Sequence, residues 1–249
     1  GILLGDPTED GYYLTSRWSC SNGGAESLKQ GLRLFDIRTV EEGMDLLGKL
    51  EVSFNWVAAD DQGNIGYQMS GLLPKREGFS GFCPMPGWES KYDWKGFHEP
   101  KDLPRQLNPD CGWIVTANED LSEFGNVNPH SIAMGAYRSD RIKALLNSKE
   151  KLDADDMRKF QLDDLSLQAE LFMPLIEPHL DNSENANTLR DWDYRYNVES
   201  KGAVIFECIY EEVVKAVFGK IGTNVLNFMF EETGYIADFY DNFDKILLN

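Results

Sequence analysis

Alternating apolar and polar positions predict a β-hairpin over FNWVAADDQGNIGYQMSGLLPKR, residues 54–76. Its two apolar runs flank the segment 60–64, which is rich in the Asp, Gly and Asn residues of turns. Asn55 interrupts the pattern near the start of the first run. Asparagine is depleted in strand interiors because its amide competes for backbone hydrogen bonds. Asn55 therefore either satisfies a neighbouring group or has a function.

The pattern around the hairpin predicts a mixed α/β part over residues 1–135. Aromatic and β-branched residues favour strands over 11–19 and 112–118. Thr39 with Glu42 three residues later is a capping-box signature, so we expect a helix that leads into the hairpin. The intervening residues 74–112 are rich in Pro, Gly and aromatics, which indicates a long irregular segment of the kind that often carries function.

Apolar residues recur at helical spacing from residue 138 onward. Asp153 is the expected N-cap of one helix, and AVIFECIYEEVVKAVF, residues 203–218, reads as a long amphipathic one. We therefore expect residues 136–249 to be mainly helical, and the chain as a whole to be of the α+β class.

Charge and composition exclude several classes of function. The 249 residues include 42% apolar residues, a globular composition, and carry a formal net charge of −18. Nucleic acids and anionic membrane surfaces need a basic face, so neither is an expected partner. There is also no apolar run of the roughly 20 residues that span a bilayer, and no signal-peptide pattern at the start.

Common catalytic and metal motifs are missing from the sequence. It contains no G-x-S-x-G elbow, no phosphate loop and no H-E-x-x-H helix. The four cysteines are widely spaced, so four buried thiols are favoured over a zinc site, with a Cys83–Cys111 bridge as the minor alternative. The tryptophans in strand-like runs, at positions 18, 56 and 113, are expected in the core, whereas Trp88 and Trp94 in the long segment are candidate cleft residues.

Several blocks of the chain, in order, resemble one family. FNWVAADDQGNIGY is followed by G-x-x-P-x-R ending at Arg76, then by PMPGW, YDWKGF, NPDCGWIVTAN and YRSDRIKALL. These blocks are similar to the β chain of the penicillin acylase and acyl-homoserine lactone acylase family of N-terminal-nucleophile hydrolases. The resemblance covers most of the chain to about residue 210.

The resemblance implies part of an αββα sandwich that hydrolyses the amide bond of N-acyl compounds of the β-lactam or acyl-homoserine lactone type. In such enzymes the first residue of the mature β chain, Ser, Cys or Thr, attacks the carbonyl while its own α-amine acts as the base. Gly1 has no side chain, so we expect the nucleophile to lie upstream and this chain to be inactive alone. By position, Asn55 matches the family's oxyanion-hole asparagine and Arg76 the arginine that orients it.

The same resemblance suggests the remaining groups. Trp56 and Trp88 are candidate substrate-contacting residues, although the place of Trp56 beside Asn55 favours packing over chemistry. No cofactor or resident metal is expected; calcium, which some members bind, would lie near Asp60. The expected partners are the N-acyl amide substrate and the rest of the acylase precursor, namely its α chain and the N-terminal part of its β chain, in the periplasm or outside the cell.

A second hypothesis of a different class remains open. Without a nucleophile, the chain could be a non-catalytic binding module that holds a ligand with the aromatic loop 79–97. The residues that precede Gly1 in the parent protein distinguish the two hypotheses, because only the enzyme needs a Ser, Cys or Thr exposed by processing.

Overall fold

The computed structural model describes residues 1–21, 23–129, 133–227, 244–245 and 247–248. Contacts divide the chain into two compact units. Unit 1 comprises residues 1–114 and 120–132, and unit 2 comprises residues 115–119 and 133–249. The division into domains 1–135 and 136–249 stays a prediction, since a compact unit need not fold independently.

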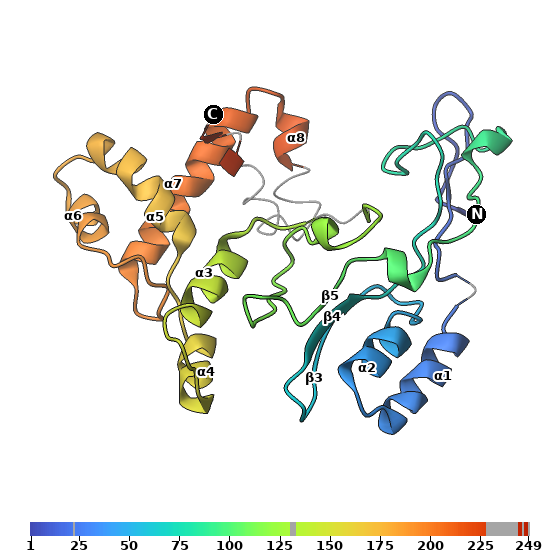
Figure 1. Ribbon diagram of the computed structural model, residues 1–249. Coiled ribbons are helices and arrows are strands. Elements are labelled where there is room, and N and C mark those ends of the chain that lie inside the picture. The colour runs from blue at the N-terminus through green and yellow to red at the C-terminus, as the bar shows by residue number, and fades with distance from the viewer. Residues whose placement is uncertain (22, 130–132, 228–243, 246, 249) are drawn as a thin grey trace. The chain divides into compact units, whose positions relative to one another are not determined.

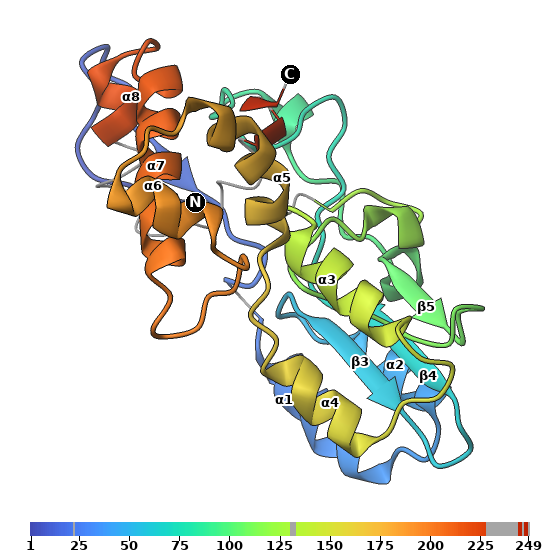
Figure 2. The ribbon, with the colours of Figure 1, turned by 90° about the vertical axis from the view of Figure 1, so that its left-hand side faces the viewer.

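A three-stranded antiparallel sheet forms the centre of unit 1. Its order is β3 (Asn55–Ala59), β4 (Ile65–Met69) and β5 (Arg105–Leu107), which can be followed in Figure 2. Asn55 lies opposite Met69, and Ala59 lies opposite Ile65. The hairpin predicted from the alternating pattern is confirmed. β5, in contrast, lies in the segment expected to be irregular.

Helix α2 (Val40–Leu47) covers one face of this sheet, and α1 (Ala25–Arg33) lies beside α2 (Figure 1). The Thr39 side chain accepts from the Glu42 backbone N–H at 3.2 Å, so the predicted N-cap is confirmed. α2 buries Val40 and Met44 against β4, so closely that a Cβ on Gly66 would lie 2.4 Å from Val40 Cγ1. The face of the sheet that carries Gly66 is therefore the one packed on α2.

Two strand predictions fail for a common reason. The segment 11–19 is strand only at β2 (Thr15–Ser16), which pairs with β1 (Ile2–Leu3) on the exposed surface. The segment 112–118 forms no strand at all. Both have β-forming residues, but an extended strand also needs a partner strand and a covered face. Among the described residues, 11–19 has a two-residue partner but no covered face, and 112–118 has no partner strand.

Exposure also corrects the expectations for cysteine and tryptophan. Cys83, Cys111 and Cys208 are exposed and Cys20 is half-buried, so four buried thiols is a wrong prediction; all four are free. Trp18 is 65% exposed because it follows the short β2 strand, over which no core forms.

Short 3₁₀ segments occur in both units, and the other regular elements in the described part of unit 2 are α-helices. The 3₁₀ segments are η1 (Leu34–Asp36), η2 (Ser90–Tyr92), η3 (Pro100–Asp102), η4 (Ser122–Phe124) and η5 (Glu177–His179). The helices of unit 2 are α3 (Tyr137–Leu146), α4 (Ala154–Gln161), α5 (Leu167–Ile176), α6 (Glu184–Arg190), α7 (Lys201–Phe218) and α8 (Thr223–Asn227). Asp153 caps α4 in a complete capping box with Asp156, as expected.

The core of unit 2 forms between α5, α6 and α7, which lie together in Figure 1. Phe206, Tyr210 and Val214 of α7 are almost fully buried and meet Phe172 of α5 and Leu189 of α6. Across the described residues, no helix combines the length and the apolar composition needed to cross a membrane.

An ion-pair network in unit 2 leads to a prediction on acid stability. Arg141 donates from Nε and Nη2 to both oxygens of Asp163 at 2.6 and 2.8 Å, and the Asp163 side chain is only 11% exposed. These hydrogen bonds lower the pKa of Asp163. A carboxyl with a depressed folded-state pKa stabilises the fold above its unfolded pKa of about 3.9 and loses this effect as the pH falls through the folded value.

We therefore expect Asp163→Asn to lower the melting temperature at neutral pH, and the deficit relative to the wild type to shrink below about pH 4. Asp155→Asn is the matched control, because the Asp155–Arg158 pair is 73% exposed on both sides and should contribute little at any pH. Melting curves of the wild type and the two variants, recorded between neutral and acidic pH, measure these differences in melting temperature. A deficit that stays constant on acidification would contradict the role given to the carboxylate.

Candidate functional site

Asn55 lies exposed at the first position of β3, and its side-chain amide has a buried hydrogen-bond partner among the described residues. The hydroxyl of Tyr67, on β4, donates to Asn55 Oδ1 at 2.8 Å. In the strand register Tyr67 lies opposite Val57, so Asn55 and Tyr67 are diagonal neighbours on one face of the hairpin. This is the face opposite the one packed on α2.

The turn of the hairpin is held by Asp60. Its carboxylate accepts from the backbone N–H groups of Gln62 and Asn64 at 3.0 and 2.9 Å, and from the Asn64 amide. It also accepts from the Val40 N–H at 3.3 Å, which ties the turn to α2. The hydrogen bonds from Asn64 lower the pKa of Asp60. The turn therefore fixes the register that places Asn55 beside Tyr67.

Both Asp60 oxygens are thus occupied by donors of the protein itself. Among the described residues, no three His, Cys, Asp or Glu side chains lie close enough together to hold a metal ion. The absence of a metal or cofactor stays a prediction.

Ser70, which is fully buried, bonds to the residues on both sides of Asn55, through backbone before it and through a side chain after it. Its Oγ accepts from the Phe54 backbone N–H at 3.2 Å and from Trp56 Nε1 at 2.9 Å, and it donates to Val52 O at 2.6 Å. The indole N–H of Trp56 is therefore used within the hairpin. This arrangement supports the packing interpretation of Trp56.

Arg76 follows the hairpin and lies half-buried against the aromatic segment. Its guanidinium carbon is 5.6 Å from the centre of the Trp94 ring, and that of Arg17 is 4.4 Å from the same ring. Burial lowers the pKa of Arg76. Arg76 Nε is buried and has no hydrogen-bond partner among the described residues.

Gly81 approaches Arg76 closely, since a Cβ on it would lie 2.8 Å from Arg76 Nε, and its φ of 90° favours glycine. The described residues show no hydrogen bond between Arg76 and Asn55. The orienting role of Arg76 stays a prediction.

Trp88 presents an open aromatic surface in the segment 79–97. It is 73% exposed and stacks on Tyr12, with ring centres 5.6 Å apart. Trp94 instead packs edge-on against Phe97. Of the two candidate cleft tryptophans, Trp88 is the one whose ring is mostly open to a ligand.

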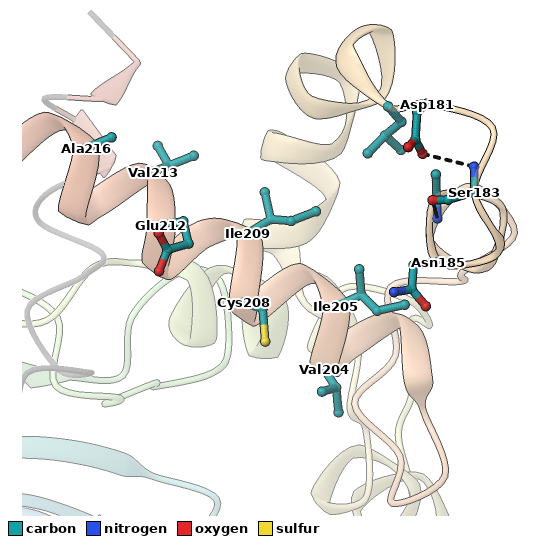
Figure 3. A pocket seen from close by; sticks show the side chains of 12 residues that line it. Asp181, Ser183, Asn185, Val204, Ile205, Cys208, Ile209, Glu212, Val213 and Ala216 are labelled. Carbon is teal, nitrogen blue, oxygen red and sulfur yellow. Dashed lines mark hydrogen bonds between the residues drawn. The ribbon is translucent and has the colours of Figure 1, made fainter.

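A cavity of about 780 Å³ lies in unit 2, between α7 and the segment 180–186 (Figure 3). Its walls are mainly apolar, with Val204, Ile205 and Val213 of α7 and a few polar side chains such as Asp181. Asp181 accepts from the Ser183 N–H at 2.9 Å, the dashed line in Figure 3. None of the site residues predicted from the sequence lines this cavity.

Tyr67 and Ser70 were not among the site residues predicted from the sequence. Both stand in the predicted second strand of the hairpin, where their polar groups looked incidental. The available signal was the register: a turn at 60–64 places position 69 opposite 55 and puts Tyr67 on the same face as Asn55.

Comparisons with known proteins show which family the chain resembles. It matches the family model described as penicillin amidase over residues 1–245. It is 30% identical over 191 residues to the acyl-homoserine lactone acylase QuiP of Pseudomonas aeruginosa, covering 76% of this chain and 22% of that protein. It is 29% identical over 181 residues to the penicillin acylase 2 proenzyme of Pseudomonas sp. strain SE83, covering 69% of this chain and 23% of that protein.

A solved structure of a penicillin acylase is also similar to this chain. The thermostable penicillin G acylase of Alcaligenes faecalis superposes with a TM-score of 0.77 at 20% identity, over 94% of this chain and 45% of that chain. This likeness confirms the predicted fold, part of an N-terminal-nucleophile hydrolase with a mainly helical C-terminal part. The chain spans less than a quarter of the length of the two relatives named above. The family model matches this chain over residues 1–245, so the chain belongs to the penicillin amidase family.

Proposed function

We propose that this chain is part of an amidohydrolase that cleaves the amide bond of N-acyl compounds, with Asn55 as one donor of its oxyanion hole. The observation that carries the proposal is the placement of Asn55 within a chain that belongs to an acylase family. Its amide is exposed, its carbonyl oxygen is engaged by Tyr67, and the hairpin beneath it is fixed by Asp60 and Ser70. A preorganised donor of this kind stabilises charge that develops in a transition state.

The proposed reaction is acyl transfer to an N-terminal nucleophile supplied by residues outside this chain. The nucleophile's oxygen or sulfur bonds to the amide carbon, and its proton passes to the α-amine, directly or through a water. The carbonyl π electrons move to oxygen, where Asn55 Nδ2 and a backbone N–H from elsewhere in the protein donate. Collapse of this intermediate breaks the C–N bond, and the α-ammonium returns the proton to the departing amine. Water then hydrolyses the acyl-enzyme.

Other residues of unit 1 have supporting roles in this proposal. Arg76, whose half-buried guanidinium lies over Trp94, is proposed to help orient Asn55 and the groups around the nucleophile. The exposed ring of Trp88 is proposed to contact the substrate. The partners are the N-acyl amide and the remainder of the acylase precursor, and the proposed compartment is the periplasm or the exterior.

The exposed stack of Trp88 on Tyr12 is also the observation that favours the second candidate, a binding module without catalysis. One experiment separates the two. The whole parent protein is expressed, its processed chains are sequenced from their N-termini, and release of amine from N-acyl amides of both classes is measured. If the parent protein is an enzyme, we expect a new N-terminal Ser, Cys or Thr together with turnover. A parent without such a residue, or without amide hydrolysis, would contradict the proposed function.

A further inference from the structure

The Asn55 amide accepts a hydrogen bond from a buried hydroxyl, that of Tyr67. An asparagine amide has an acceptor end, Oδ1, and a donor end, Nδ2, and only the donor end can stabilise an oxyanion. The Tyr67 hydroxyl donates to Oδ1 at 2.8 Å, which directs the acceptor end towards β4. With the amide turned over, Oδ1 would face the oxyanion and repel it. Control of this flip is therefore control of the proposed oxyanion hole.

Tyr67 is itself held in place. Its side chain is 1% exposed, and its strand is paired on both sides, with Val57 of β3 opposite it on one side and Gln106 of β5 on the other. A residue in the middle strand of a sheet has little freedom to follow Asn55 if the amide rotates. Tyr67 therefore provides a fixed donor rather than one that adapts.

The backbone around Asn55 is fixed independently of Tyr67. Ser70 Oγ accepts from the Phe54 N–H and from the Trp56 indole, the residues on either side of Asn55. The backbone pairing of β3 with β4 then begins at Asn55 itself. The remaining freedom of Asn55 is rotation of its amide about the Cβ–Cγ bond, which exchanges Oδ1 and Nδ2. The hydrogen bond from Tyr67 fixes this rotation.

We propose that Tyr67 is a positioning residue that orients the Asn55 amide with Nδ2 towards the oxyanion. This inference rests on the proposed function, because it gives Tyr67 a role only if Asn55 is an oxyanion donor. Tyr67 is 1% exposed and its hydroxyl donates to Asn55, so its proposed effect runs through Asn55. The effect must therefore appear in kcat rather than in KM, and must vanish when Asn55 is absent.

The test is a double-mutant cycle in the whole acylase, with Tyr67→Phe, Asn55→Ala and the double variant assayed on an N-acyl amide. Tyr67→Phe removes one oxygen and leaves the buried ring. We expect it to lower kcat about 10-fold, the scale of one hydrogen bond, with KM within about twofold. In the Asn55→Ala background the same substitution should change kcat by less than about twofold.

Tyr210→Phe is the matched control. Tyr210 is equally buried, and its hydroxyl donates to Asp244 inside the helical unit 2, so this variant also loses a buried phenol hydrogen bond. We expect a lower melting temperature with kcat and KM unchanged. A fall in kcat in Tyr210→Phe as large as that in Tyr67→Phe would show that any loss of a buried hydroxyl lowers activity, and would overturn the positioning role.

The outcomes separate the two proposals. If Asn55→Ala keeps wild-type activity, the oxyanion role of Asn55 fails, and the role of Tyr67 fails with it. If Asn55→Ala is impaired but Tyr67→Phe has wild-type kcat, only the inference on Tyr67 is overturned. If Tyr67→Phe lowers kcat by the same factor with or without Asn55, its role is structural and the inference is again overturned.

Discussion

Replacement of Asn55 by alanine is expected to lower the kcat of the proposed acylase by about 100- to 1,000-fold, with KM nearly unchanged. The physical reason is that the amide carbonyl of a substrate is neutral, whereas its oxygen is an anion in the tetrahedral intermediate. A donor fixed by the hairpin interacts more strongly with the anion than with the neutral group, so its removal raises the barrier selectively. The loss corresponds to about 3–4 kcal/mol of transition-state stabilisation.

The measurement must separate turnover from processing, because an acylase precursor gains its nucleophile only when it is cleaved. The kcat value is therefore normalised to the amount of processed enzyme, counted by mass spectrometry of the new N-terminus. Asn55→Asp is the matched variant: it keeps the shape, but it replaces the donor with a negative charge, so its loss should be at least as large. Asn55 is exposed, so both variants should keep their circular dichroism. An Asn55→Ala enzyme within twofold of the wild type would place the oxyanion donor elsewhere.

The elements that could be predicted from the sequence are those whose signals are local. The turn at 60–64 is set by Asp60 and its own neighbours, and the helices after Thr39 and Asp153 begin with side chains that cap their own backbone. These contacts join residues two to four positions apart. Such contacts depend little on the rest of the fold, so a pattern in the sequence is enough to find them.

The two strand predictions failed because strand formation depends on residues far away in the sequence. The segments 11–19 and 112–118 have suitable residues for strands, but pairing is a property of two segments, and the described residues offer 112–118 no partner strand. The site shows the same limit. Asn55 could be singled out as an anomaly in its strand, yet the hydroxyl that orients it comes from β4, twelve positions later, and only the register reveals it.

A further contact without a local signal is that of Asp244, which is expected to carry the largest single contribution to the stability of unit 2. Its carboxylate is 1% exposed and accepts from Tyr137 Oη at 2.8 Å and from Gln168 Nε2 at 2.9 Å, and also from the Tyr210 hydroxyl. These donors stand on α3, α5 and α7. One buried side chain thus joins three helices of the unit, 34 to 107 positions away in the sequence.

We expect Asp244→Ala to destabilise the protein by about 3–5 kcal/mol, because hydrogen bonds to a charged group contribute about 1.5–3 kcal/mol each and buried networks of this kind are costly to break. Urea unfolding followed by far-UV circular dichroism measures the change. A graded series tests the reason for it. Asp244→Asn keeps the volume and one acceptor oxygen and should lose less, and Tyr137→Phe removes one of the donors to Asp244 and should lose about 1 kcal/mol. If all three variants lost the same stability, neither packing volume nor the number of acceptor oxygens would explain the loss. If Asp244→Ala unfolded at the wild-type urea midpoint, the three helices would be held by their apolar contacts alone.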